Sequence, residues 1–270
     1  MHRTVNCIIC DSRSEYYFTK FFDEFGLGRV DYWRCCECGF TLSRTHAEMT
    51  PELWRQINEK FHASFFGKQS NLLDPRWLSR LQSQAVMLAD CVEVGLLKNS
   101  GRWLDYGCGD GKLSDMLKQE YKLDMLKYDE YLSMRPDYLG SSDLVPGGYD
   151  FVLTTSVFEH LTKREQLDQI SSLVASRGIL GLHTMVREGI PCDPEWFYLH
   201  PVHCAFYTNE SMRRLLRQWG YVCSVYNVEA RFWLCFKSLS ENIEAVVAAA
   251  NRRINKPSYL YKQGFVDYWK

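Results

Sequence analysis

The sequence Leu104-Asp105-Tyr106-Gly107-Cys108-Gly109-Asp110-Gly111 is the most informative segment of this 270-residue chain. A short apolar run, Trp103-Leu104, leads into it, and an amphipathic stretch from Lys112 to Tyr121 follows it. The three glycines let the backbone turn sharply and approach a ligand where any Cβ would collide with it. The pattern therefore predicts a strand, a ligand-binding loop and a helix in succession.

Further apolar runs follow this unit and alternate with amphipathic stretches. The runs are Trp103-Leu104, Leu123–Tyr128, Phe151–Thr155, Ile179–Val186, Val222–Tyr226 and Arg231–Phe236. Strands that alternate with helices of this length predict an α/β fold with a doubly wound, mostly parallel sheet and helices on both faces. No clear helix separates the last two runs, which predicts a hairpin at one sheet edge.

The residue composition and the pattern of apolar residues change at three points along the chain, which predicts four segments. Residues 1–47 are rich in cysteine and aromatic residues, and residues 48–98 carry apolar positions at helical spacing after a capped start at Thr50-Pro51. Residues 99–240 hold the alternating runs, and residues 241–270 begin with an expected helix over 241–256. We expect a zinc-ribbon module, a helical connector or lid, a nucleoside-binding domain, and a closing helix with a tail.

An acidic residue stands where such a domain binds ribose. Asp129 lies eighteen residues after Gly111, at the end of the next apolar run, with Glu130 beside it. That position falls at the carboxyl edge of the sheet, next to the glycine loop. A carboxylate there can accept both ribose hydroxyls, each bond contributing about 1.5–3 kcal/mol. Asp129 is the predicted ribose ligand, and Glu130 is the alternative.

These elements resemble motifs of class I S-adenosylmethionine (SAM) methyltransferases, a Rossmann-like family. Leu104–Gly111 is similar to motif I of that family, and Tyr149–Leu161 resembles its fourth-strand segment, which continues into a VLEH-type helix start. A nicotinamide-binding Rossmann domain would share the glycine turn and the acid but would lack the Glu-His pair. The resemblance implies an enzyme that transfers a methyl group from SAM.

The resemblance also implies which residues contact the donor. Asp105 and Gly107 would lie near the methionine moiety, Gly109 near the nucleoside, and Asp129 at the ribose. The other implied donor-site residues are Gly111, Glu130, Asp143, Leu144, Thr155 and Ser156. Among these, Asp143-Leu144 resembles the adenine-contacting position, and Thr155 and Ser156 would flank the methyl-donor pocket.

Two CxxC pairs near the N-terminus predict a metal site. Cys7 and Cys10 form the first pair, and Cys35 and Cys38 the second. Two such turns can present four thiolates to one tetrahedral zinc ion, and four protein ligands make the zinc structural. The alternative is four buried thiols. Cys36 is an alternative ligand, but with one residue between them Cys36 and Cys38 are less well spaced to bind the same metal ion than Cys35 and Cys38.

The segment Trp196–Thr208, followed by an expected helix from Asn209 to Trp219, suggests an acceptor site. It resembles the "HxxFYS" segment of bacterial methyltransferases that modify sugars, nucleotide-linked sugars and related polar metabolites, several of which carry an N-terminal CxxC…CxxC ribbon. The resemblance implies a sugar-like acceptor, methylated on oxygen or carbon.

Three histidines are candidates for contact with the acceptor. His203 matches the family histidine, and a neutral imidazole can accept a hydroxyl proton as the methyl group transfers. His160 follows the fourth strand and is expected in the pocket, and His183 is the weaker candidate after the fifth strand. We do not expect His183, His200 and His203 to bind a second metal together.

Composition limits the partners. The formal net charge is −1 and the sequence pI is about 6.7, which favours a small-molecule or glycan acceptor over nucleic acid. The alternatives are a ribosomal- or transfer-RNA methyltransferase with a zinc module and a non-catalytic interaction platform on the same fold. No run of 18 apolar residues predicts a membrane span, and no signal peptide is apparent, so we expect a cytoplasmic protein. The oligomeric state is not predicted.

Overall fold

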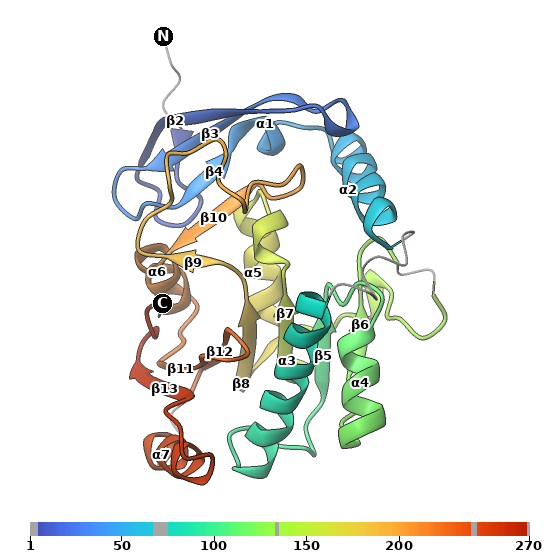
Figure 1. Cartoon of the computed structure of the whole chain (residues 1–270), viewed down its shortest axis with the longest axis vertical. Helices are drawn as coiled ribbons and strands as arrows, with labels where there is room; N and C mark the ends of the chain where they lie inside the picture. The colour runs from blue at the N-terminus through green and yellow to red at the C-terminus, as the bar shows by residue number, and fades with distance from the viewer. Residues whose placement is uncertain (1–4, 67–74, 133–134, 239–241, 269–270) are drawn as a thin grey trace.

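The computed structural model of the chain describes residues 5–66, 75–132, 135–238 and 242–268. Its strands form two sheets, a seven-stranded one in the body of the molecule and a six-stranded one at the top of Figure 1. Among the described residues, no helix has the length and apolar character that crossing a membrane requires.

The seven-stranded sheet contains the predicted runs. Its strands are β5 (Trp103–Tyr106), β6 (Leu126–Tyr128), β7 (Tyr149–Thr155), β8 (Val174–His183), β11 (Cys223–Asn227), β12 (Phe232–Phe236) and β13 (Tyr259–Gln263). Their order is β13-β11-β12-β8-β7-β5-β6. The pairs from β6 to β8 are parallel, whereas β8–β12, β12–β11 and β11–β13 are antiparallel. The sheet is therefore mixed, which corrects the expectation of a mostly parallel one.

The expected hairpin is confirmed, but it does not form the edge of the sheet. Strands β11 and β12 pair antiparallel over five residues each. Strand β13, which comes from the tail, then pairs with β11 and takes the edge position. A helix, α7 (Ile243–Arg253), precedes it, so the closing helix expected over 241–256 is present, although residue 241 lies outside the described residues.

Helices cover both faces of this sheet. One face packs against α3 (Pro75–Glu93), α4 (Lys112–Tyr121) and α7, through residues that include Leu88, Leu117 and Val247. The other face packs against α5 (Arg164–Leu173) and α6 (Asn209–Gln218), through residues that include Ile170 and Leu215. Alternate residues of a strand face opposite sides, and all of these side chains are buried. The result is a three-layer α/β arrangement.

The six-stranded sheet joins the N-terminal segment to a later part of the chain. Its strands are β1 (Val5–Asn6), β2 (Arg13–Phe22), β3 (Gly28–Cys35), β4 (Thr41–Ser43), β9 (Val186–Arg187) and β10 (Ala205–Thr208). Their order is β1-β2-β3-β4-β10-β9, with β10 antiparallel to β4. The segment between β8 and α6 thus leaves the main sheet and pairs with the N-terminal strands, a relationship that spacing along the sequence does not reveal.

A short helix and a longer one follow the N-terminal strands. The helix α1 (Arg44–Ala47) leads into α2 (Pro51–Phe66), which runs down the right-hand side of the molecule in Figure 1. His46, on α1, is buried and hydrogen-bonds through its two ring nitrogens to the Ser43 hydroxyl at 2.6 Å and the Pro201 carbonyl at 2.9 Å. The N-terminal sheet is therefore fixed to the loop that precedes β10.

The capped helix start predicted at Thr50 is confirmed, and α6 has a similar cap at Thr208. The Thr50 hydroxyl accepts the backbone N–H of Leu53 at 3.2 Å, and the Thr208 hydroxyl accepts that of Ser211 at 3.1 Å. A third parallel strand between β6 and β7, which the sequence indicated only poorly, is replaced in the described residues by a single bridge between Lys127 and Tyr138.

Candidate active site

The glycine loop between β5 and α4 has the conformation that its sequence requires. Gly107, Gly109 and Gly111 have φ values of 71°, 56° and 77°, in the left-handed region that favours glycine. A Cβ on Gly107 would lie 2.6 Å from the Cγ2 atom of Val157. The loop therefore packs closely against the residue that follows the carboxyl end of β7, and this contact leaves no room for a side chain at Gly107.

Asp129 fastens this loop to the end of β6. Its Oδ2 atom accepts the backbone N–H of Gly109 at 3.0 Å, and its Oδ1 atom accepts that of Tyr131 at 2.9 Å. Burial raises the pKa of the carboxyl group, and the N–H donors oppose this shift. Each oxygen retains a lone pair for a further donor such as a hydroxyl group. Glu130, the alternative ribose ligand, is exposed.

Asp105 is a buried acid beneath the loop, only 1% exposed. Its Oδ2 atom accepts the Ser114 hydroxyl at 2.7 Å, whereas its Oδ1 atom is buried without a hydrogen-bond partner among the described residues. Burial raises the pKa of Asp105 to about 7, and the Ser114 hydroxyl opposes this shift. An unpartnered buried oxygen is costly and is available to a donor on a ligand.

The remaining predicted donor-site residues fall in two places. Thr155 ends β7, and Ser156 follows it with a φ of 55° while its N–H donates to the His183 carbonyl at 2.8 Å. Asp143 ends the short helix η2 (Ser141–Asp143), where its Oδ2 atom accepts the Gly140 N–H at 2.9 Å. Leu144 packs against the main core. Thr155, Ser156 and Val157 thus lie together at the carboxyl end of β7, where the Val157 side chain packs against Gly107.

Four histidine rings gather beside the loop. His160 ends the short helix η3 (Phe158–His160), and its ring centroid lies 5.1 Å from that of His203 and 6.0 Å from that of His62. His200 lies 4.8 Å from His203. The structure therefore brings the two predicted acceptor contacts, His160 and His203, together. His62, on α2, was missed because no local motif links it to residues about 100 positions further along the chain.

The protonation of His203 is fixed by a backbone carbonyl. Its Nδ1 atom lies 2.8 Å from the Tyr198 carbonyl, which can only accept, so Nδ1 carries the hydrogen in the neutral ring and Nε2 has the lone pair. Burial lowers the pKa of His203 to about 4 and lowers that of His160 well below its usual value. Both rings are therefore neutral near pH 7.

Glu159 is a second residue that the acceptor prediction missed. It is 1% exposed, and its carboxylate accepts the Thr184 hydroxyl at 2.8 Å and the Tyr198 hydroxyl at 2.7 Å. Glu159, His160 and His203 place one ligand atom each within 4.8 Å of one another. The available signal was the Glu-His pair itself, which served only to identify the strand.

His183 lies apart from this cluster. Its Nδ1 atom hydrogen-bonds to the Arg231 carbonyl at 2.8 Å, and its Nε2 atom lies 3.5 Å from Nη1 of Arg80. The structure thus places it with β12 and α3 rather than with the other candidate histidines.

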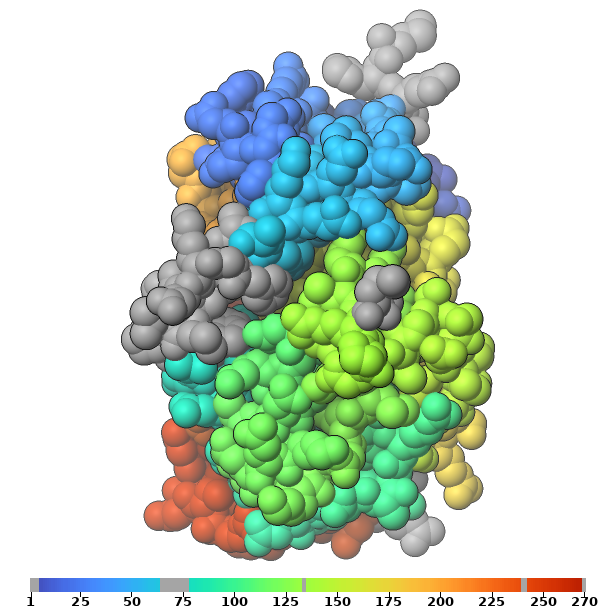
Figure 2. All heavy atoms as spheres, turned by 90° about the vertical axis from the view of Figure 1, so that its right-hand side faces the viewer, coloured from blue at the N-terminus to red at the C-terminus, as the bar shows by residue number. Residues whose placement is uncertain are grey.

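A groove of about 660 Å³ lies next to the site, between α2, the residues after Asp129, and the start of α5. Its walls include Trp54, Arg55, Tyr131 and Lys163. The Arg55 guanidinium lies 5.8 Å from the Tyr131 ring centroid, and that ring lies 6.4 Å from the ring of His62. Figure 2 shows this side of the molecule, where α2 (light blue) lies above the green segments that follow α4. Tyr131 therefore links the groove to the histidine cluster.

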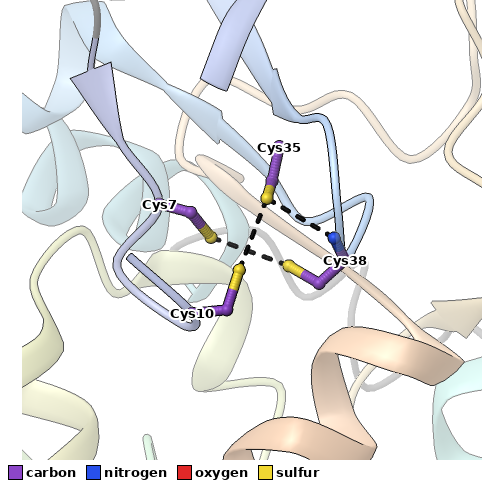
Figure 3. A group of neighbouring side chains, drawn as sticks. All are labelled: Cys7, Cys10, Cys35 and Cys38. Carbon is purple, nitrogen blue, oxygen red and sulfur yellow. Dashed lines mark hydrogen bonds between the residues drawn. The ribbon is translucent and has the colours of Figure 1, made fainter. Parts of the chain in front are cut away.

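The four predicted cysteine ligands converge in the N-terminal sheet. Their sulfur atoms lie within 4.8 Å of one another and point toward a common centre (Figure 3). Sγ of Cys7 lies 3.7 Å from that of Cys38, and Sγ of Cys10 lies 3.5 Å from that of Cys35. Zn–S bonds of about 2.3 Å in a tetrahedron require sulfur separations of about 3.8 Å, so the four thiols fit this metal. Cys36 is exposed and lies outside the group.

Comparison with known proteins identifies the family. Residues 80–224 match a family described as a methyltransferase domain. No curated protein matches the chain. Two solved structures resemble it with a TM-score of 0.46. One is a SAM-dependent methyltransferase from Thermotoga maritima, a possible histamine N-methyltransferase, with 17% identity over 68% of this chain and 100% of that one. The other is 1,6-didemethyltoxoflavin-N1-methyltransferase from Burkholderia thailandensis, with 12% identity over 81% of this chain and 96% of that one.

A third similar structure is magnesium protoporphyrin IX methyltransferase from Synechocystis with bound SAM, with 21% identity, a TM-score of 0.37, and coverage of 58% of this chain and 80% of that one. The family match covers more than half of the chain. This protein therefore belongs to the methyltransferase-domain family and is a methyltransferase.

Proposed function

We propose that SAM binds over the glycine loop, with Asp129 at its ribose and Asp105 and Gly107 near its methionine moiety. Two observations support this: three glycines hold the loop after β5 in the left-handed region, and Asp105 has a buried oxygen without a partner among the described residues. The ammonium group of the methionine moiety is the kind of donor that this oxygen lacks. SAM supplies an electrophilic methyl group there. Thr155 and Ser156 flank the methyl pocket, and Asp143-Leu144 contacts the adenine.

The acceptor in this proposal is a sugar or a nucleotide-linked sugar. The groove beside the histidine cluster has the size and chemistry for such a molecule. Trp54 and Tyr131 offer aromatic surface for a sugar ring, and Arg55 and Lys163 offer cations for phosphate groups. One observation supports this proposal most directly. The ring of Tyr131, in the wall of the groove, contacts the ring of His62, which in turn contacts the ring of His160.

His203 acts on the acceptor through its Nε2 atom, which holds the lone pair. A hydroxyl oxygen beside Nε2 can give up its proton to this nitrogen while the same oxygen takes the methyl group, and the donor leaves as a neutral thioether. His160 contacts the same acceptor. The main contribution of the chain is to hold the acceptor oxygen and the methyl carbon at about 3–3.5 Å in line.

The N-terminal sheet carries a structural zinc ion on Cys7, Cys10, Cys35 and Cys38 in this proposal. The tetrahedral fit of the four sulfur atoms supports it. The Tyr32 hydroxyl donates to the His203 carbonyl at 3.3 Å. A folded zinc module would thus position the acceptor histidine without taking part in the chemistry.

The test is methyl transfer from methyl-labelled SAM to a panel of free sugars, nucleotide-linked sugars and RNA. We expect label in at least one sugar-containing acceptor, with kcat reduced in His203→Ala and unchanged in Cys36→Ser. Label in RNA alone would show that the acceptor is RNA and not a sugar. Full turnover by His203→Ala would remove the role given to His203, and a folded protein that binds no SAM would refute the donor site.

A further inference from the structure

The strongest unassigned feature is the cluster of Glu159, His160 and His203. One ligand atom from each lies within 4.8 Å of the other two. The first two residues belong to η3, and the third lies in the loop before β10. The cluster therefore sits where the two sheets meet, beside the acceptor groove.

Glu159 is a buried acid without a cationic partner among the described residues. Within this part of the chain its oxygens accept from two neutral hydroxyl groups, those of Thr184 and Tyr198. None of the ion pairs among the described residues includes Glu159. Buried charges in proteins are normally paired or bound to metals. The two hydroxyl groups orient the carboxylate, but they do not neutralise it.

The two imidazoles present free nitrogen atoms. Nδ1 of His160 is buried and has no hydrogen-bond partner among the described residues. Nδ1 of His203 is taken by the Tyr198 carbonyl, and Nε2 makes no hydrogen bond within the described part of the chain. Metal-bound histidines commonly hold their second ring nitrogen on a carbonyl in this way. Tyr198 therefore supports two members of the cluster, Glu159 through its hydroxyl and His203 through its carbonyl.

We propose that Glu159, His160 and His203 together bind one divalent metal ion. Two imidazoles and one carboxylate suit Mn²⁺, Fe²⁺, Co²⁺ or Zn²⁺ and leave coordination positions open. Binding draws the ligand atoms from within 4.8 Å to the roughly 3–3.5 Å that metal bonds of about 2.1 Å require. A hydroxyl oxygen of the acceptor could occupy one of the open positions.

This inference rests on the proposed function for its acceptor and changes the role of His203. An Nε2 atom bound to a metal cannot also accept a proton, so the ion would instead lower the pKa of a bound hydroxyl group, whose proton would pass to solvent water. The two roles exclude each other. Metal binding is measurable without donor or acceptor, and failure of one proposal is therefore distinguishable from failure of the other.

The experiment titrates Mn²⁺ into the full chain, whose zinc content is measured beforehand, and follows free Mn²⁺ by electron paramagnetic resonance. We expect one Mn²⁺ per chain. His203→Asn and His160→Asn should each weaken binding by about tenfold or more, and Tyr198→Phe, which keeps the carbonyl and loses the hydroxyl, by roughly tenfold. His183→Asn is the matched control, because His183 is half-buried like His203 and lies outside the group of three ligand atoms.

SAM binding measured by calorimetry on the same variants shows whether each still folds. A wild-type protein that binds SAM but no Mn²⁺, Fe²⁺ or additional Zn²⁺ would overturn the metal site. So would variants of the three ligands that bind Mn²⁺ as tightly as the wild type. Methylation that persists at full rate after dialysis against a chelator, with the structural zinc retained, would return His203 to the role of base.

Discussion

Asp129 and Gly109 are joined by a 3.0 Å hydrogen bond from the glycine N–H to the Oδ2 atom of the carboxylate. The bond ties the end of β6 to the middle of the glycine loop, across twenty positions of sequence. The carboxylate thus shapes the loop, and each of its oxygens keeps a lone pair for a further donor. The same residue is expected to affect both the stability of the loop and the binding of the donor.

Asp129→Ala should weaken SAM binding by about 10- to 100-fold, because one or two charge-assisted hydrogen bonds of about 1.5–3 kcal/mol are lost. Isothermal calorimetry measures the dissociation constant. Glu130→Ala is the matched control, since this neighbouring acid is exposed, and it should bind within about threefold of the wild type. Equal losses in both variants would show that local charge, rather than the position of Asp129, matters.

Gly107→Ala should destabilise the protein and impair SAM binding, because the new Cβ would lie 2.6 Å from Val157. A left-handed alanine costs about 1–2 kcal/mol, and overpacking adds roughly 1–3 kcal/mol. Urea unfolding measures the change in the free energy of unfolding. Gly147→Ala has a similar φ of 65° but no atom within 4 Å of its Cβ, so it carries only the first cost.

The double variant Gly107→Ala/Val157→Ala removes the collision but keeps the backbone strain. Its SAM affinity should recover partly, provided that the collision displaces the loop. No recovery, with normal folding, would mean that the alanine methyl group itself occupies the space needed by the donor.

The site residues that could be predicted best from the sequence are those that lie close together along the chain. The glycine loop, the acid after β6 and the CxxC turns are local patterns, because a tight turn or a strand end places their members together. Cys7 and Cys38 are separated by 31 positions, yet each CxxC turn already fixes two thiols. Only the pairing of two such turns had to be inferred.

The arrangement of the proposed acceptor-site residues depends on contacts between distant parts of the chain, which no local sequence pattern encodes. Glu159 meets Tyr198 across 39 positions, and His62, on α2, lies 6.0 Å from His160 between ring centroids. Strand β10 joins the N-terminal sheet by pairing with β4, which moves His203 toward that sheet. Such relationships follow from tertiary packing, and one sequence contains no periodic signal for them.

Cys38→Ser should abolish zinc binding and lower the melting temperature, because loss of one thiolate opens a site that supports the fold of the N-terminal sheet. Elemental analysis should find one zinc per wild-type chain. Cys36→Ser is the control for the loss of a nearby thiol, and it should retain the metal, because Cys36 is exposed and outside the cluster. Retention of zinc by Cys38→Ser, or its loss from Cys36→Ser, would reassign the ligands.

Asp105 should make the stability of the donor-free protein depend on pH. Burial raises its pKa to about 7 from the usual 3.8. Between these values the folded protein keeps a proton that the unfolded chain has lost, so this contribution to stability is fully present below pH 4 and is lost as pH rises through 7. From pH 5 to pH 8 the loss amounts to about 2–3 kcal/mol.

Asp105→Asn isolates this contribution, because the amide is neutral at every pH and has nearly the same shape. Buried histidines such as His203, whose pKa values are lowered, make stability change with pH in the opposite direction, but they do so in both proteins. The difference in unfolding free energy between Asp105→Asn and the wild type should therefore move in favour of the variant from pH 5 to pH 8. A difference that stays constant across this range would show that Asp105 is ionised in the folded state at both pH values.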